Sequence, residues 1–176
     1  PYIKPQKLDQ FALGFYKKLE FLNFESEFFY KKIKNRIDYI DDADLIANND
    51  IETVLLNGKS RAYGAEFLVE KSYGKHRFWI AYTISKSEQK TGGIGENDLG
   101  INNGEWYLTP YDKTHDVSFN SSYKINKKLI LNTNFIYQTG QPTTYPNAQY
   151  NYMNLSIPNY GNRNTFRLPN YHRLDF

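Results

Sequence analysis

The chain has 176 residues, and its 22 lysines and arginines exceed its 19 aspartates and glutamates by only three. This small, dispersed charge gives none of the strongly basic surface on which nucleic-acid binding depends, so no nucleic-acid partner is expected. The 17% aromatic content excludes a chain that is disordered throughout. Without cysteine, and with only three widely spaced histidines, the sequence offers no disulfide and no metal-ligand spacing. We expect no metal and no other cofactor.

The two ends of the chain read as cuts through a longer protein. Residues 1–11 lack the apolar segment of a signal peptide, and the chain stops inside an alternating pattern at 173–176. No apolar run approaches the roughly 20 residues that a membrane-spanning helix needs. We therefore expect a segment of a larger protein.

Apolar and polar residues alternate with a period of two along most of the chain, which predicts β-strands. The predicted strands cover residues 7–18, 23–41, 60–72, 76–88, 113–125, 128–139 and 171–176. In residues 76–88, for example, Phe78, Ile80, Tyr82 and Ile84 share one face.

Short and long connections alternate between these strands. Tight turns are predicted near 19–22, 73–75 and 126–127, and long loops at 41–59, 89–110 and 140–170. Structureless loops of this length are uncommon in compact soluble domains. Short turns at one end and long loops at the other are typical of outer-membrane barrels. The predicted fold is all-β, an antiparallel transmembrane β-barrel segment of about seven strands with short periplasmic turns and long extracellular loops.

The two faces of the predicted strands differ as the wall of a barrel requires. One face is apolar at mid-strand, carries charge only near the strand ends, and suits lipid. The other face includes Glu66, Glu70 and Arg77 and suits a wet lumen. Lys32 and Lys34 fall on the proposed lipid face, and we place them above the membrane. The alternative is a soluble, aromatic-rich β-sandwich that binds carbohydrate, because a sheet with one solvated face alternates in the same way.

Five motifs occur in order along almost the whole chain. They are Tyr-Lys-Lys-Ile-Lys-Asn-Arg-Ile-Asp-Tyr at 30–39, Gly-Lys-Ser-Arg-Ala-Tyr-Gly-Ala-Glu at 58–66, Asp-Lys-Thr-His-Asp at 112–116, Tyr-Gln-Thr-Gly-Gln-Pro at 137–142 and Arg-Leu-Pro-Asn-Tyr-His-Arg-Leu-Asp at 167–175. Together they resemble the barrel region of TonB-dependent outer-membrane receptors, in particular those of Bacteroidetes-type bacteria.

That resemblance implies a barrel of about 22 strands around a plugged lumen, of which residues 1–176 supply about seven from the C-terminal half. It implies energised import across the outer membrane of a Gram-negative bacterium, in which the barrel wall does no chemistry, so the chain is not an enzyme. The implied partners are outer-membrane lipid, the receptor's own plug, and TonB. The plug, the TonB-contacting region and the final strands are not in this sequence. The ligand (a siderophore, a glycan or a similar nutrient) and a capping surface lipoprotein stay open.

Aromatic residues on the predicted loops are the candidate ligand contacts, because such rings stack on sugars and on aromatic siderophores. The candidates are Trp106, Tyr107, Tyr111, Tyr145 and Tyr150. Trp106, Tyr107 and Tyr111 suit an outer aromatic girdle equally well. Charged residues of the predicted lumen face are candidate contacts to the wall or the plug, namely Glu66, Glu70, Arg77, Arg173 and Asp175.

Asp112, His115 and Asp116 lie close in sequence but do not form a catalytic group. His115 and Asp116 point to opposite faces of a strand. No serine lies in a nucleophile elbow, and no metal triad exists. We predict no catalytic residue, and expect Asp112 or Asp116 to pair with a neighbouring arginine or lysine near the outer rim. Gly64, inside a predicted strand, is expected to allow a bend or the close approach of a lumen group.

Overall fold

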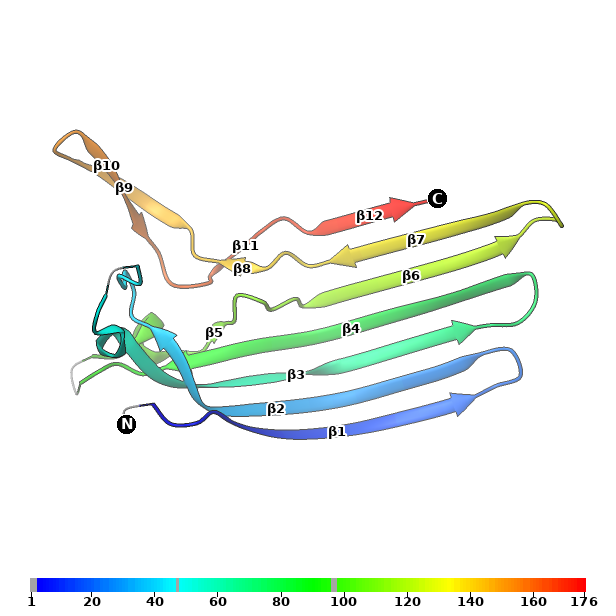
Figure 1. Ribbon diagram of the computed structural model, residues 1–176, viewed down its shortest axis with the longest axis horizontal. Coiled ribbons are helices and arrows are strands. Elements are labelled where there is room, and N and C mark those ends of the chain that lie inside the picture. The colour runs from blue at the N-terminus through cyan, green and yellow to red at the C-terminus, as the bar shows by residue number, and fades with distance from the viewer. Residues whose placement is uncertain (1–2, 47, 96–97) are drawn as a thin grey trace.

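The computed structural model describes residues 3–46, 48–95 and 98–176. Its long strands lie side by side in one antiparallel sheet, with tight turns at one end and loops at the other (Figure 1). In spatial order they are β1 (Lys7–Lys18), β2 (Asn23–Tyr39), β3 (Leu55–Lys71), β4 (His76–Thr91), β6 (His115–Lys124), β7 (Ile130–Gln138) and β12 (Tyr171–Asp175). The predicted all-β antiparallel sheet of about seven strands is confirmed.

The loop end of the sheet contains short elements. These are η1 (Ile51–Val54), η2 (Ile101–Gly104), β5 (Tyr107–Leu108), β8 (Pro142–Thr143), β9 (Pro146–Tyr152), β10 (Leu155–Tyr160) and β11 (Phe166–Arg167). Strand β5 extends the sheet beside β4, and β8 pairs with β11. Strands β9 and β10 form a hairpin that projects away from the sheet (Figure 1). Met153 and Asn154 at its turn both have positive φ, which two-residue hairpin turns of type I′ require.

Strands β3 and β4 are longer than the sequence pattern indicated. Strand β3 begins at Leu55 instead of residue 60, and β4 ends at Thr91 instead of residue 88. Residues 55–59 do not alternate in polarity, but they pair with the end of β2 on one side, and Gly58 and Lys59 also pair with β4. Pairing with neighbouring strands therefore decides the conformation of residues 55–59, and the sequence pattern of one strand does not reveal such pairing.

The registers place the apolar faces of neighbouring strands together. Phe11 of β1 is opposite Tyr30 of β2, and Tyr30 is opposite Tyr63 of β3. Further along, Phe119 of β6 is opposite Phe135 of β7. Side chains that are directly opposite share one face of the sheet, so the strands form one continuous apolar surface. Much of it is exposed within this chain; Phe11, for example, is 72% exposed.

A β-bulge interrupts the alternation of β2. Lys34 pairs with Lys59 and Arg36 pairs with Gly58, so Asn35, with φ of 57°, has no partner in β3. The extra residue exchanges the two faces for the rest of the strand. Asp38 therefore lies opposite Leu56, on the polar face, instead of on the apolar face that strict alternation assigns to even-numbered residues of β2.

Gly64 lies in the middle of β3, where the neighbouring strand comes close. A Cβ atom at this position would be 2.4 Å from the carbonyl oxygen of Ile84 and 2.7 Å from the Cβ of Ser85, both in β4. The group that approaches Gly64 is thus the neighbouring strand β4, and not the lumen group that was expected.

Candidate functional site

Arg163, in the segment between β10 and β11, joins three loop-end segments. Its Nη1 donates to Asp38 Oδ1 at 3.0 Å and to the Tyr39 carbonyl oxygen at 3.0 Å, and its Nε donates to Asp41 Oδ1 at 3.1 Å. The side chain of Asn102 in η2 bonds to both the N–H and the carbonyl oxygen of Arg163. Burial lowers the pKa of the guanidinium, but the two carboxylates outweigh burial and leave it raised. Arg163 therefore stays charged and ties β2, η2 and the last loop together.

Tyr107 lies beside this ion pair and is only 5% exposed. Its hydroxyl donates to Asp38 Oδ2 at 2.7 Å and also contacts Thr91 Oγ1 at 2.8 Å and Gln89 Nε2 at 3.0 Å. The ring packs with Leu56 and Ile101 in the small buried apolar cluster. Burial, together with the negative charge of Asp38, raises the pKa of Tyr107 to about 12. Tyr107 therefore positions the loops, and the predicted role as an exposed ligand contact does not fit this geometry.

The Tyr107 hydroxyl is expected to titrate near pH 12 in the folded protein, because its pKa is raised well above the ordinary tyrosine value of 10.0. The stabilisation it gives is complete below pH 10 and is lost as the pH rises through 12. Tyr107→Phe removes this alkaline sensitivity and costs about 1–3 kcal/mol at neutral pH, because Asp38 and Thr91 lose a buried partner. The measurement is the phenolate absorbance of the intact receptor as a function of pH, taken as the difference between the wild type and Tyr107→Phe. A difference centred on pH 10 would contradict the assignment.

Arg167, in β11, forms a second ion pair. Its guanidinium binds the Asp112 carboxylate, the hydroxyl of Thr114 at 3.0 Å and the carbonyl oxygen of Gly140 at 2.9 Å. The side chain of Asp112 is fully buried and also accepts a hydrogen bond from the Ser87 N–H. The expected pairing of Asp112 with a nearby arginine is confirmed, and the arginine comes from 55 residues further along the chain.

His115 and Asp116 are separated as the strand pattern predicts. His115 Nδ1 lies 2.9 Å from the Tyr82 hydroxyl on the apolar face. On the other face, Asp116 accepts a hydrogen bond from Gln138 and lies 4.0 Å from Lys113 Nζ. Asp112, His115 and Asp116 thus take part in three different sets of contacts. They do not form an acid–base pair.

The candidate loop aromatics do not form one group. The guanidinium carbon of Arg61 lies 4.2 Å from the centre of the Trp106 ring, on the side of the sheet that carries the apolar surface. Tyr111, in contrast, lies 6.0 Å from the guanidinium carbon of Arg36, which shares the polar face with Gly58. Trp106 and Tyr111 therefore lie on opposite sides of the sheet.

Tyr145 and Tyr150 do come together, in a hollow of about 1380 Å³ at the loop end. Its lining is rich in aromatic rings and side-chain amides; it includes Tyr145, Tyr150, Tyr160, Phe166, Asn103, Asn147, Asn159 and Asn162. Tyr145 and Tyr150 are 60% and 56% exposed, and the Tyr145 ring centre is 5.1 Å from that of Phe166. Arg163 and Asp41 also line the hollow, so the ion pair that joins the loops forms part of its wall.

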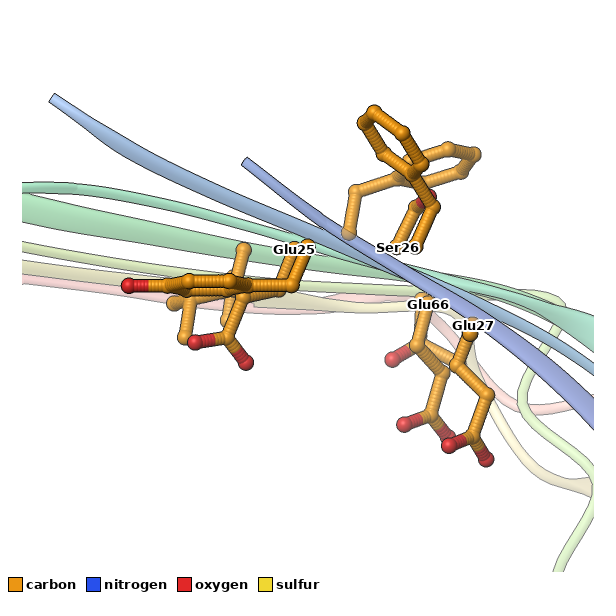
Figure 2. Close-up of a pocket in the computed structure, with 11 residues that line it drawn as sticks. Glu25, Ser26, Glu27 and Glu66 are labelled. Carbon is orange, nitrogen blue, oxygen red and sulfur yellow. The ribbon is translucent and has the colours of Figure 1, made fainter. Parts of the chain in front are cut away.

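The polar face of the sheet carries adjacent carboxylates. Glu27 of β2 is directly opposite Glu66 of β3, and Figure 2 shows both projecting from the same side, with Ser26 on the other. Glu66, Glu70 and Arg77 are exposed within this chain. Arg173 pairs with Asp175 on its own strand, at 2.9 Å from Oδ2. A ladder from Arg173 or Asp175 to Glu66 or Glu70 is not seen among the described residues.

No helix in the described parts of the chain is long and apolar enough to cross a membrane. Within residues 3–46, 48–95 and 98–176, no group of three or more histidine, aspartate or glutamate side chains is placed to hold a metal ion.

A sheet with one continuous apolar face, one polar face, tight turns at one end and structured loops at the other defines the wall of an outer-membrane β-barrel. All 176 residues match the family model described as TonB dependent receptor-like, beta-barrel. The chain therefore belongs to the TonB-dependent receptor barrel family, whose members are non-enzymatic transporters of the Gram-negative outer membrane. A search of curated proteins found no match, and a search of solved structures found none either. Family membership sets aside the alternative of a soluble carbohydrate-binding sandwich.

Sequence reasoning missed Arg163, Asp38 and Gln89. Arg163 is the only charged residue of 140–166, and an isolated charge in a long uncharged loop is the signal that points to a partly buried ion pair. Nothing local marks Asp38, because its position depends on the bulge at Asn35.

Proposed function

We propose that this chain is the part of a TonB-energised import receptor that forms barrel wall and ligand-recognition loops. The observation that carries the proposal is the hollow lined by Tyr145 and Tyr150, which opens at the loop end of a membrane-type sheet. Ligand pockets of this kind combine apolar rings with a few fixed polar groups. The motifs at 58–66, 137–142 and 167–175 further support a Bacteroidetes-type receptor and the C-terminal half of its barrel.

We propose a glycan as the ligand in preference to a siderophore. The charged groups of the hollow are Asp41, Asp42 and Arg163, and Arg163 is already paired with Asp41. Among the described residues that line the hollow, no free cation is available to a ferric siderophore that carries several negative charges. Amide side chains each provide donors and an acceptor, and tyrosine rings provide apolar faces. An uncharged ligand with many hydroxyl groups fits this lining.

The polar face of the sheet is proposed to face the lumen and to contact the plug. Glu25, Glu27, Glu66 and Glu70 place four exposed carboxylates on neighbouring strands. Carboxylates directly opposite each other repel, so a basic surface on the plug would stabilise them. The hairpin of β9 and β10 projects beyond the sheet and is the surface we assign to a capping lipoprotein, if the receptor has one.

The test uses source cells and the intact receptor. An antibody to residues 98–109 should detect an outer-membrane band well above the 20.7 kDa of this chain, with a mobility that changes on boiling. Uptake of a neutral oligosaccharide should require TonB. Tyr150→Ala should lower that uptake about two- to twelvefold, because an aromatic contact contributes about 0.5–1.5 kcal/mol.

The matched control is Tyr73→Ala, which removes a 66% exposed tyrosine from the turn at the opposite end of the sheet. Uptake and membrane level should stay at the wild-type value. If TonB-dependent uptake of a ferric siderophore required Tyr150, the proposal of an import receptor would stand, but the proposal of a glycan ligand would be contradicted. A soluble band near 20.7 kDa would contradict import itself.

A further inference from the structure

Four lysines are directly opposite one another across β1 to β4. Lys7 pairs with Lys34, Lys34 with Lys59, and Lys59 with Lys90, so their side chains share the face that carries the apolar surface. The row spans about 14 Å, because neighbouring strands are about 4.8 Å apart. Like charges directly opposite each other are destabilising. A row of four therefore indicates a binding partner with negative charge.

The next row towards the apolar surface adds both signs of charge. It contains Asp9, Lys32, Arg61 and Glu88. Arg61 Nη2 and Lys86 Nζ bind the Glu88 carboxylate at 2.9 and 2.6 Å, and Lys34 lies 3.6 Å from Asp9. Lys86, one row further, completes the set. We call these residues the basic stripe; they comprise seven cations and two carboxylates, a net charge of +5.

The carboxylates of the basic stripe do not neutralise it. Both are bound to cations of the stripe itself. In the part of the chain that the structure describes, no carboxylate lies within ion-pair distance of Lys7, Lys59 or Lys90. The first two of these lysines are exposed and the third is partly exposed. The three ammonium groups are thus available to an anion from outside the chain.

The stripe lies at the height of lipid head groups. The stacked rings of Tyr30 and Tyr63 mark the upper edge of the apolar surface, and Lys71 marks its lower edge. Eight residues at about 3.4 Å and a tilt of about 40° give about 21 Å, close to the roughly 25 Å apolar band of outer-membrane barrels. The lysine row lies about 10 Å above Tyr63 on the same arithmetic. The head-group layer extends roughly 5–8 Å beyond the hydrocarbon, within reach of a lysine side chain.

We propose that the basic stripe binds the phosphate groups of a lipid in the outer leaflet, a phosphorylated lipid A being the occupant. The loop end of an outer-membrane barrel is extracellular, so this face meets the outer leaflet. Trp106 supports the placement, because its ring centre lies 5.8 Å from Lys59 Nζ and 4.2 Å from the Arg61 guanidinium carbon, in the position of an interfacial aromatic residue. The site is on the external wall and takes no part in ligand import.

The test measures binding of phosphorylated lipid A to the intact receptor in a nonionic detergent by native mass spectrometry. The double variant Lys34→Gln/Lys59→Gln should bind about 30-fold more weakly, because each surface cation contributes about a factor of five at an anionic lipid surface. Lys34→Arg/Lys59→Arg should bind like wild type. The control Lys75→Gln/Lys127→Gln removes the same charge from turns at the other end and should change nothing.

Two further probes separate lipid from free phosphate. Dephosphorylated lipid A should bind as weakly to wild type as the phosphorylated lipid binds to Lys34→Gln/Lys59→Gln. Inorganic phosphate should not displace the bound lipid. Displacement by inorganic phosphate, or equal losses in the Lys34/Lys59 and Lys75/Lys127 variants, would overturn the proposal. Neither result bears on import, which is tested by uptake.

Discussion

Replacing Arg167 by methionine is expected to destabilise the barrel by about 3–5 kcal/mol, because it leaves a buried carboxylate without its cation. The Asp112 side chain is fully buried. Among the described residues, the Ser87 N–H would be the remaining hydrogen-bond donor to this carboxylate, while Thr114 and the Gly140 carbonyl would lose their donor. The measurement is denaturant unfolding of the intact receptor in detergent, followed by loss of heat-modifiable migration.

A second variant separates charge burial from lost packing. Arg167→Met/Asp112→Asn should recover most of the stability, because the amide keeps an acceptor for Ser87 and carries no charge. Arg173→Met is the matched control: its ion pair with Asp175 is well exposed, and such pairs contribute about 0.2–1 kcal/mol. Equal destabilisation by Arg167→Met and Arg173→Met would contradict the role given to Asp112.

Arg163→Met is expected to release the last loop from the rest of the rim. The variant removes bonds to Asp38, Asp41 and the Tyr39 carbonyl, and bonds to charged groups contribute about 1.5–3 kcal/mol each. Amide hydrogen exchange in 160–165 and 100–109 should accelerate at least about tenfold, which corresponds to about 1.4 kcal/mol. The strands of the sheet should keep wild-type exchange, since the contacts of Arg163 to them are confined to Asp38 and Tyr39 at the loop end of β2.

The control for Arg163 is Arg77→Met, which removes an exposed arginine near the opposite end of β4. Exchange in 160–165 should not change in this variant. If Arg163→Met left loop exchange at the wild-type rate, the ion pair would not be what assembles the hollow. Ligand uptake would then have to be assigned to another part of the rim.

The strands, and the face of the sheet on which each side chain lies, were predictable because both follow from the local alternation of apolar and polar residues. Strand β1 has the bounds that the pattern assigns, Lys7–Lys18. The pairing of Phe119 with Phe135 follows from keeping both on one face. The start of β3 at Leu55 was not predictable, because residues 55–59 are held by pairing with a strand whose own register changes at Asn35.

The candidate site was predictable only in part. Tyr145 and Tyr150 line the hollow, and their setting among asparagine and proline was visible in the sequence. Tyr107 was indistinguishable from them by residue type, although it is buried against Asp38. The hydrogen-bond partners of the Tyr107 hydroxyl are 16 to 69 residues away, and contacts over such separations are set by the folded loops and not by neighbours in sequence.

The bulge at Asn35 shows how this fold treats changes in chain length. One added residue inside a strand reverses inside and outside for everything up to the next turn, as it does for Asp38. One residue added in the loop between β9 and β10 leaves every side chain of the long strands on the same face of the sheet. During divergence, insertions and deletions should therefore accumulate in the loops above the bilayer, while crossing segments keep their lengths. New ligand specificities can then arise by exchanging loops on a wall whose inside and outside are already fixed.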